Sequence, residues 1–132
     1  MTQQATVKLL QSNGQVKDLV LRYSIQSPWF IESPFDPGKK YEGDDLFQCL
    51  QSLRSDLEET GARLLCNGSR VNSYPSRMSR EMGGARKVCI LCKGRQAGSG
   101  DLVDTFGDAP ADCVGTVAEQ EAFYHDWIAS LR

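Results

Sequence analysis

Residues 5–25 read ATVKLLQSNGQVKDLVLRYSI, and this stretch decides the fold class. Two runs rich in β-branched and other apolar residues, Ala5 to Leu10 and Val16 to Ile25, flank Ser12-Asn13-Gly14. Asn-Gly between two such runs is the strongest short signal for a tight turn between antiparallel strands. The sequence therefore predicts that residues 5–25 form a β-hairpin.

The residues after the hairpin predict a short strand, a loop and a long helix. Trp29 to Ile31 is a candidate third strand, and Ser33 to Gly38, with two prolines, is typical of an exposed loop. From Asp44 the apolar residues recur at helical spacing until Gly61, a residue type that commonly ends helices. The periodic positions are Leu46, Leu50, Leu53 and Leu57.

The second half of the chain contains four further candidate elements. Ala62 to Cys66 has strand character, and KVCILCK at residues 87–93 is typical of a buried central strand. Ser76 to Met82 predicts a short helix closed by Gly83-Gly84, and Thr116 to Glu119 is a capping box that begins a final helix. We therefore expect an α+β fold, with a mainly antiparallel sheet of about four or five strands covered on one face by helices at 44–60 and 116–131.

Length and composition indicate one globular domain, residues 1–132. A chain of 132 residues, 40% apolar and 24% charged, buries enough surface to fold without disulfides or metal. The N-terminal residues lack the pattern of a signal peptide, and no apolar run is long enough to cross a membrane. Five cysteines scattered among apolar neighbours suit reduced thiols, so a cytoplasmic location is expected.

Charge is segregated along the chain, although the net charge is only −2. Residues 61–95 contain eight of the fifteen basic side chains and one acid, Glu81, while both flanking stretches are acidic. Six of the eight are arginine, whose planar guanidinium binds phosphate or carboxylate oxygens two at a time. Glycines beside them let a ligand approach the backbone amides. The predicted ligand-binding residues are Arg70, Tyr74, Arg77, Arg80, Gly83, Gly84, Arg86 and Lys87. The alternative is that these cations pair with acids of the flanking segments and form a solvated surface.

Other motifs are weaker. Cys89 and Cys92 form a C-x-x-C pair, but positions three apart on a strand face opposite sides, which favours core packing over metal or redox use. Cys89 and Arg95 have the C-x5-R spacing of cysteine-dependent phosphatases, yet the apolar run after Cys89 predicts a buried thiol. His125 is the sole histidine, which removes most general-base and multi-histidine schemes. We expect no metal site and no cofactor.

The sequences YPSRMSREMGGARK at residues 74–87 and GTVAEQ at residues 115–120 resemble segments of small uncharacterised bacterial proteins. The resemblance covers the C-terminal half and implies no activity and no catalytic residue. It favours residues 74–87 as the working part of the chain.

The sequence predicts a non-catalytic module that binds an anionic small molecule or an acidic protein surface through residues 70–87. Nucleic acid is less favoured, because a pI near 5.4 opposes broad nonspecific binding. One alternative is an enzyme acting on a phosphorylated or carboxylated substrate in the same pocket, with Cys89, Tyr74 or Ser79 as the reacting group. Another is an interaction or inhibitor module that uses its acidic ends.

Overall fold

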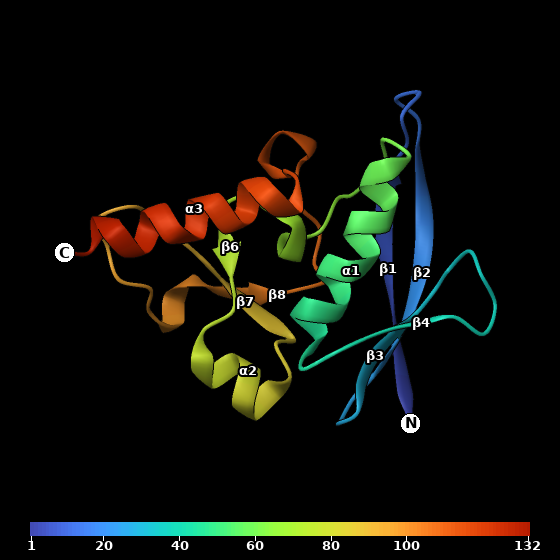
Figure 1. Ribbon diagram of the computed structural model, residues 1–132, viewed down its shortest axis with the longest axis horizontal. Helices are drawn as coiled ribbons and strands as arrows, with labels where there is room; N and C mark the ends of the chain where they lie inside the picture. The colour runs from blue at the N-terminus through green and yellow to red at the C-terminus, as the bar shows by residue number, and fades with distance from the viewer.

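The predicted hairpin is present in the structure, a computed structural model that describes residues 1–132. Strands β1 (Thr2–Leu10) and β2 (Val16–Ser24) pair antiparallel, from Thr2 with Ser24 to Leu10 with Val16. The predicted third strand is β3 (Trp29–Glu32), and β4 (Lys40–Gly43) follows the loop. With the short β5 (Arg63–Leu64), these strands form a curled antiparallel sheet in the order β4-β3-β2-β1-β5 (Figure 1).

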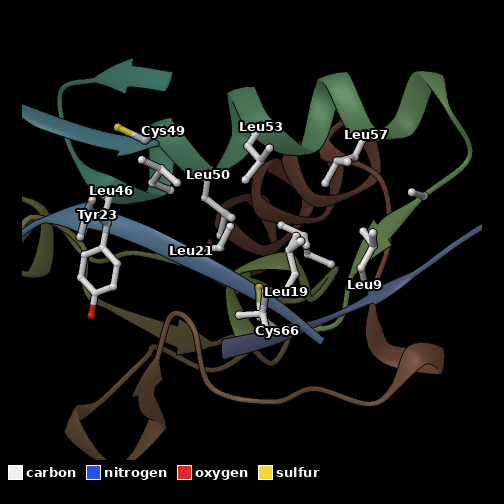
Figure 2. Close-up of a cluster of buried hydrophobic side chains, with 14 residues drawn as sticks. Leu9, Leu19, Leu21, Tyr23, Leu46, Cys49, Leu50, Leu53, Leu57 and Cys66 are labelled. Carbon is white, nitrogen blue, oxygen red and sulfur yellow. The ribbon is translucent and has the colours of Figure 1, made fainter. Parts of the chain in front are cut away.

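Helix α1 (Leu46–Glu59) packs against one face of this five-stranded sheet. Asp45 begins it, because its side chain accepts a hydrogen bond from the Gln48 amide at 2.8 Å. The four leucines that predicted the helix are buried against Leu9, Leu19 and Leu21 of the hairpin (Figure 2). Each buried leucine contributes about 1.5–3 kcal/mol, so this cluster holds the helix on the sheet.

The second half of the chain forms a separate sheet. Strands β6 (Ser73–Tyr74), β7 (Lys87–Ile90) and β8 (Leu102–Asp104) pair antiparallel in that order, and α2 (Arg77–Gly83) connects the first two. Short 3₁₀ turns lie at Asn67–Ser69, Ser99–Asp101 and Ala111–Cys113. The first four residues of KVCILCK therefore form a central strand, in a three-stranded sheet, while residues 91–93 lie beyond the predicted strand's actual end.

Helix α3 (Val117–Ser130) begins at the predicted capping box, with Thr116 and Glu119 exchanging hydrogen bonds of 2.8 and 3.1 Å. It lies beside β6 and contacts α1 (Figure 1). The expectation that both long helices cover one face of a single sheet is therefore not confirmed. Within α3 only Gln120 is fully buried, and Tyr124 stacks on Tyr74 of β6 at 3.7 Å. Its half-buried aromatic stripe thus packs on the small sheet.

A buried arginine joins the two halves. Arg54 of α1 is 3% exposed and donates hydrogen bonds to the carbonyl oxygens of Gly68 and Gly115, at 3.3 and 3.0 Å, and to Gln120 Oε1 at 2.6 Å. Gln120 Nε2 in turn donates to the Gly68 and Arg70 carbonyls. Burial lowers the pKa of the Arg54 guanidinium.

None of the helices has the length and apolar composition that a membrane-spanning helix needs.

Candidate functional site

Helix α2 carries most of the predicted site, and its two ends are fixed by local chemistry. Ser76 begins it by accepting a hydrogen bond from the Ser79 amide at 3.0 Å. Gly84 ends it in the left-handed conformation, with φ at +62°. A Cβ at Gly84 would overlap the Trp29 ring, so both the conformation and the close approach require glycine. The space beside Gly84, which we predicted would admit a ligand, is thus filled by the Trp29 ring.

Arg80 faces the protein rather than solvent. Its Nη1 lies 2.7 Å from Oδ2 of Asp45, whose side chain is 3% exposed, and its guanidinium lies over the rings of Phe47 and Tyr74. The same carboxylate begins α1, so this ion pair attaches α2 to the N-terminus of the long helix. The structure gives Arg80 a partner within the fold.

Arg70 and Tyr74 also have internal partners. Arg70 Nε donates to Asn67 Oδ1 at 2.8 Å. The Tyr74 hydroxyl lies 3.1 Å from both carboxylate oxygens of Glu121. Burial, with the Glu121 charge second, raises the pKa of Tyr74 to about 12. Both residues therefore hold β6 and the preceding turn in place.

A groove of 680 Å³ lies between α2, β8 and the inner face of the hairpin. We call it the α2 groove. Its apolar lining residues are Ala5, Tyr23, Met78, Met82, Leu102 and Phe106. Its polar ones include Gln3, Ser79, Arg86, Lys87 and Asp104, and Gly83 also lines it. Tyr23 and Phe106 stack with ring centroids 4.7 Å apart. The groove thus has a largely apolar lining with charge along one side.

Two methionines make the groove unusual for a monomer surface. Met78 and Met82 are 72% and 83% exposed, four residues apart on α2. Large apolar side chains that are left in water next to a groove are typical of binding surfaces, and the flexible thioether adapts to varied partners. This spacing was visible in the sequence, but nothing local to it marked the face of α2 as exposed.

The charge in the groove comes from Arg86 and Lys87. Lys87 Nζ pairs with Asp104 Oδ1 at 3.2 Å, and both side chains are more than half exposed. Arg86 is exposed, and its side chain makes one hydrogen bond, from Nε to the Gly83 carbonyl at 3.3 Å. Its terminal nitrogens have no carboxylate partner. Arg86 is therefore the free cation of the groove.

Arg77 lies elsewhere. It is paired with Glu81 at 3.1 Å and lines a second, smaller groove of 300 Å³ that is bordered by Tyr124 and Trp127. Of the predicted ligand-binding residues, the structure brings Gly83, Arg86 and Lys87 together in one groove and separates Arg77 from them. Five of the eight basic side chains at 61–95 form ion pairs, four of them with acids of the flanking segments. This is the pairing that the surface alternative anticipated.

The thiols are unlike reactive cysteines. Burial raises the pKa of Cys49 to about 12, and it also raises the pKa values of Cys66 and Cys89. Cys89 is 5% exposed on β7, whereas Cys92, beyond the strand, is exposed. The two sulfurs of the C-x-x-C pair thus lie in different environments. No group of three or more His, Cys, Asp and Glu side chains is arranged to hold a metal ion.

Sequence reasoning missed the far side of the α2 groove. Gln3, Ala5 and Tyr23 come from the hairpin, between about fifty and eighty residues before α2 in the chain, and Phe106 follows β8. In the sequence, only the alternation of side chains along the predicted strands indicated that Ala5 and Tyr23 face inward. Comparison of the chain with protein-family models gives no match, and comparison with curated proteins gives none either.

Proposed function

We propose that this protein is a non-catalytic module that binds an anionic ligand or an acidic partner in the α2 groove. Arg86 is the observation that carries the proposal. Among the eight basic side chains at 61–95, it alone is exposed and has no carboxylate within ion-pair distance. A free guanidinium beside an apolar lining favours a ligand that combines negative charge with apolar surface.

The groove supports a ligand of moderate size. Its 680 Å³ falls within the range of about 300–1,000 Å³ that is usual for small-molecule sites. Lys87 supplies a second cation if the ligand replaces Asp104 as its partner. On the sequence grounds given above, we place this module in a bacterial cytoplasm.

The rival enzyme hypothesis has less support from the candidate reacting groups. The Cys89 thiol is buried with a raised pKa. The Ser79 hydroxyl donates to the Lys87 carbonyl at 2.7 Å and contacts no general base. The raised pKa of Tyr74 keeps its phenol protonated near neutral pH. Each group is held in a form that is a poor nucleophile.

The acidic-end hypothesis also has less support. Asp101 and Asp104, from the acidic stretch, pair with Arg95 and Lys87 at 3.3 and 3.2 Å. These acids therefore neutralise the protein's own cations, and binding a basic partner would require those pairs to open.

An amide-resolved NMR titration tests the proposed function. The probes are octanoate, pyrophosphate and a short oligonucleotide, each at low salt and again at about 0.2 M salt. We expect octanoate to shift amides at 78–87 and 102–107 at both salt concentrations, and pyrophosphate to act more weakly because it lacks an apolar part.

Two matched variants test which arginine binds the negative charge of the ligand. Arg86→Ala should weaken octanoate binding at least fivefold, while Arg77→Ala, which also removes one exposed cation from residues 76–87, should leave it unchanged. Equal effects of the two variants, or shifts that vanish with salt, would contradict the proposal.

A further inference from the structure

One edge of β1 lacks a partner along most of its length. β2 pairs with β1 over all of Thr2–Leu10, but β5 pairs only with Leu9 and Leu10. On that side, the Leu65 amide donates to the Lys8 carbonyl at 2.8 Å. Successive residues of a strand direct their backbone groups to alternate sides, so Gln4 and Thr6 direct theirs to the same side as Lys8. Neither residue has a backbone partner there.

This free edge borders the α2 groove. Gln3 and Ala5, which alternate with Gln4 and Thr6 along β1, contribute to its lining, and Gln4 and Thr6 are themselves exposed. The groove is also lined by Leu102 and Asp104 of β8, which pairs with β7 alone. A row of unpaired amides and carbonyls therefore lies beside exposed methionines and a free arginine.

We propose that the α2 groove binds an extended peptide segment of another protein, rich in apolar and acidic side chains, which adds a strand to the free edge of β1. The inference rests on the proposed function and names its ligand class. The peptide backbone pairs with Gln4 and Thr6, as in other strand-addition complexes. Alternate side chains then enter the groove, apolar ones against Met78 and Met82 and an acidic one against Arg86.

Charge decides between a foreign segment and a second copy of this chain. The edge residues of β1, TQQATV at 2–7, contain no acid that could pair with Arg86 of a partner copy. An acidic segment supplies that charge, and it also competes with Asp104 for Lys87, which is more than half exposed. The groove therefore complements an acidic strand better than it complements β1 itself.

The first test uses the full chain and a set of capped octapeptides that alternate Val or Leu with Glu or Thr. On saturation with a bound peptide, hydrogen exchange of the Gln4 and Thr6 amides should slow at least tenfold. The same peptides methylated at alternate backbone nitrogens, on the edge that faces β1, should bind at least tenfold more weakly because they cannot pair.

Variants of the protein give a second test. Thr6→Pro removes an amide that bonds to nothing in the fold, and proline is tolerated at such edge positions. It should reduce peptide affinity at least tenfold, while Thr6→Val, which keeps the amide, should stay within twofold of the wild type. If Thr6→Pro fails to fold, the comparison of methylated and unmethylated peptides decides.

A charge swap tests the acidic side chain. Arg86→Glu should lose the glutamate peptides and gain binding of the same peptides with Lys in place of Glu. Arg77→Glu, the matched control on the other groove, should do neither.

The outcomes separate the two proposals. Peptide binding without protection of Gln4 and Thr6, and with equal affinity for methylated peptides, would overturn strand addition. Octanoate binding with no peptide binding would also overturn it and leave the proposed function standing. Failure of both probes would overturn both. Protection of the two amides with a doubled mass in the absence of peptide would identify a second copy as the occupant and overturn the inference.

Discussion

Replacing Arg54 by methionine tests how the two halves of the protein are held together. Methionine approximates the length and volume of the arginine stem but donates no hydrogen bond. The Gly115 carbonyl would lose its 3.0 Å donor. Gln120 Oε1 would lose its 2.6 Å donor and keep only Gln51 Nε2, at 3.4 Å. The Gly68 carbonyl would keep a donor, because Gln120 Nε2 also lies 2.8 Å from it.

The magnitude follows from one acceptor that loses its donor and a second that keeps only a long hydrogen bond. Each buried acceptor left without a partner costs about 1–3 kcal/mol. Part of this is offset, because the variant no longer buries a cation without a carboxylate partner. We therefore expect Arg54→Met to lower the free energy of unfolding by about 1–3 kcal/mol, a sizeable fraction of the 5–15 kcal/mol that is typical of a small domain.

Urea denaturation followed by tryptophan fluorescence measures this loss, with Trp29 reporting on the five-stranded sheet and Trp127 on α3. Arg63→Met is the control, since half-buried Arg63 makes one hydrogen bond, to the Val114 carbonyl at 3.2 Å, and its loss should cost at most about 1 kcal/mol. A loss below about 1 kcal/mol for Arg54→Met, or one equal to that of the control, would refute the reasoning.

Three further predictions use other contacts. Asp45→Asn keeps the cap of α1 but breaks the ion pair with Arg80. Because Arg80 is partly exposed, we expect the free energy of unfolding, measured by urea denaturation, to fall by about 1–2 kcal/mol. An unchanged free energy of unfolding would contradict a stabilising role for the pair. The pKa of Tyr74 is raised to about 12 in the folded state, against about 10 when unfolded, so its stabilisation is present below pH 10 and is lost as the pH rises toward 12. Tyr74→Phe should flatten this decline of the melting temperature at alkaline pH. An unchanged profile would show that Tyr74 does not cause the decline. A thiol reagent should modify exposed Cys92 rapidly and the three buried thiols at the rate of unfolding, and fast modification of all five cysteines would contradict their burial.

Local signals in the sequence predicted the longer elements, but not the short strands β4, β6 and β8. The Asn-Gly turn, the leucine periodicity of α1 and the Thr116 capping box each depend on residues within a few positions of one another, so the chain specifies them without reference to distant segments. The short helix between Ser76 and Gly84 was predicted for the same reason.

The division into two sheets could not be predicted in this way. Strand character does not determine which strand a segment will pair with. The strand within KVCILCK pairs with β6 and β8 rather than with the hairpin. The position of α3 depended on Tyr74 and Arg54, which lie tens of residues away from it.

The candidate site was predicted in part. The sequence identified the segment that carries Arg86 and Lys87, but not that Arg80 pairs with Asp45, thirty-five residues earlier. That pairing depends on the docking of α2 against α1, and so does the exposure of Met78 and Met82. Residue type indicated the chemistry, while the tertiary arrangement decided which cations remain free.

The hydrogen-bonded cluster around Arg54 also bears on how the molecule opens. Its partners lie fourteen, sixty-one and sixty-six residues away along the chain, so α3 cannot detach from α1 without leaving a guanidinium and several carbonyls unpaired. We therefore expect the three-stranded sheet and α3 to open only together with their contacts to α1. Slowly exchanging amides in both sheets should report the same opening free energy, and the two sheets should behave as one cooperative unit.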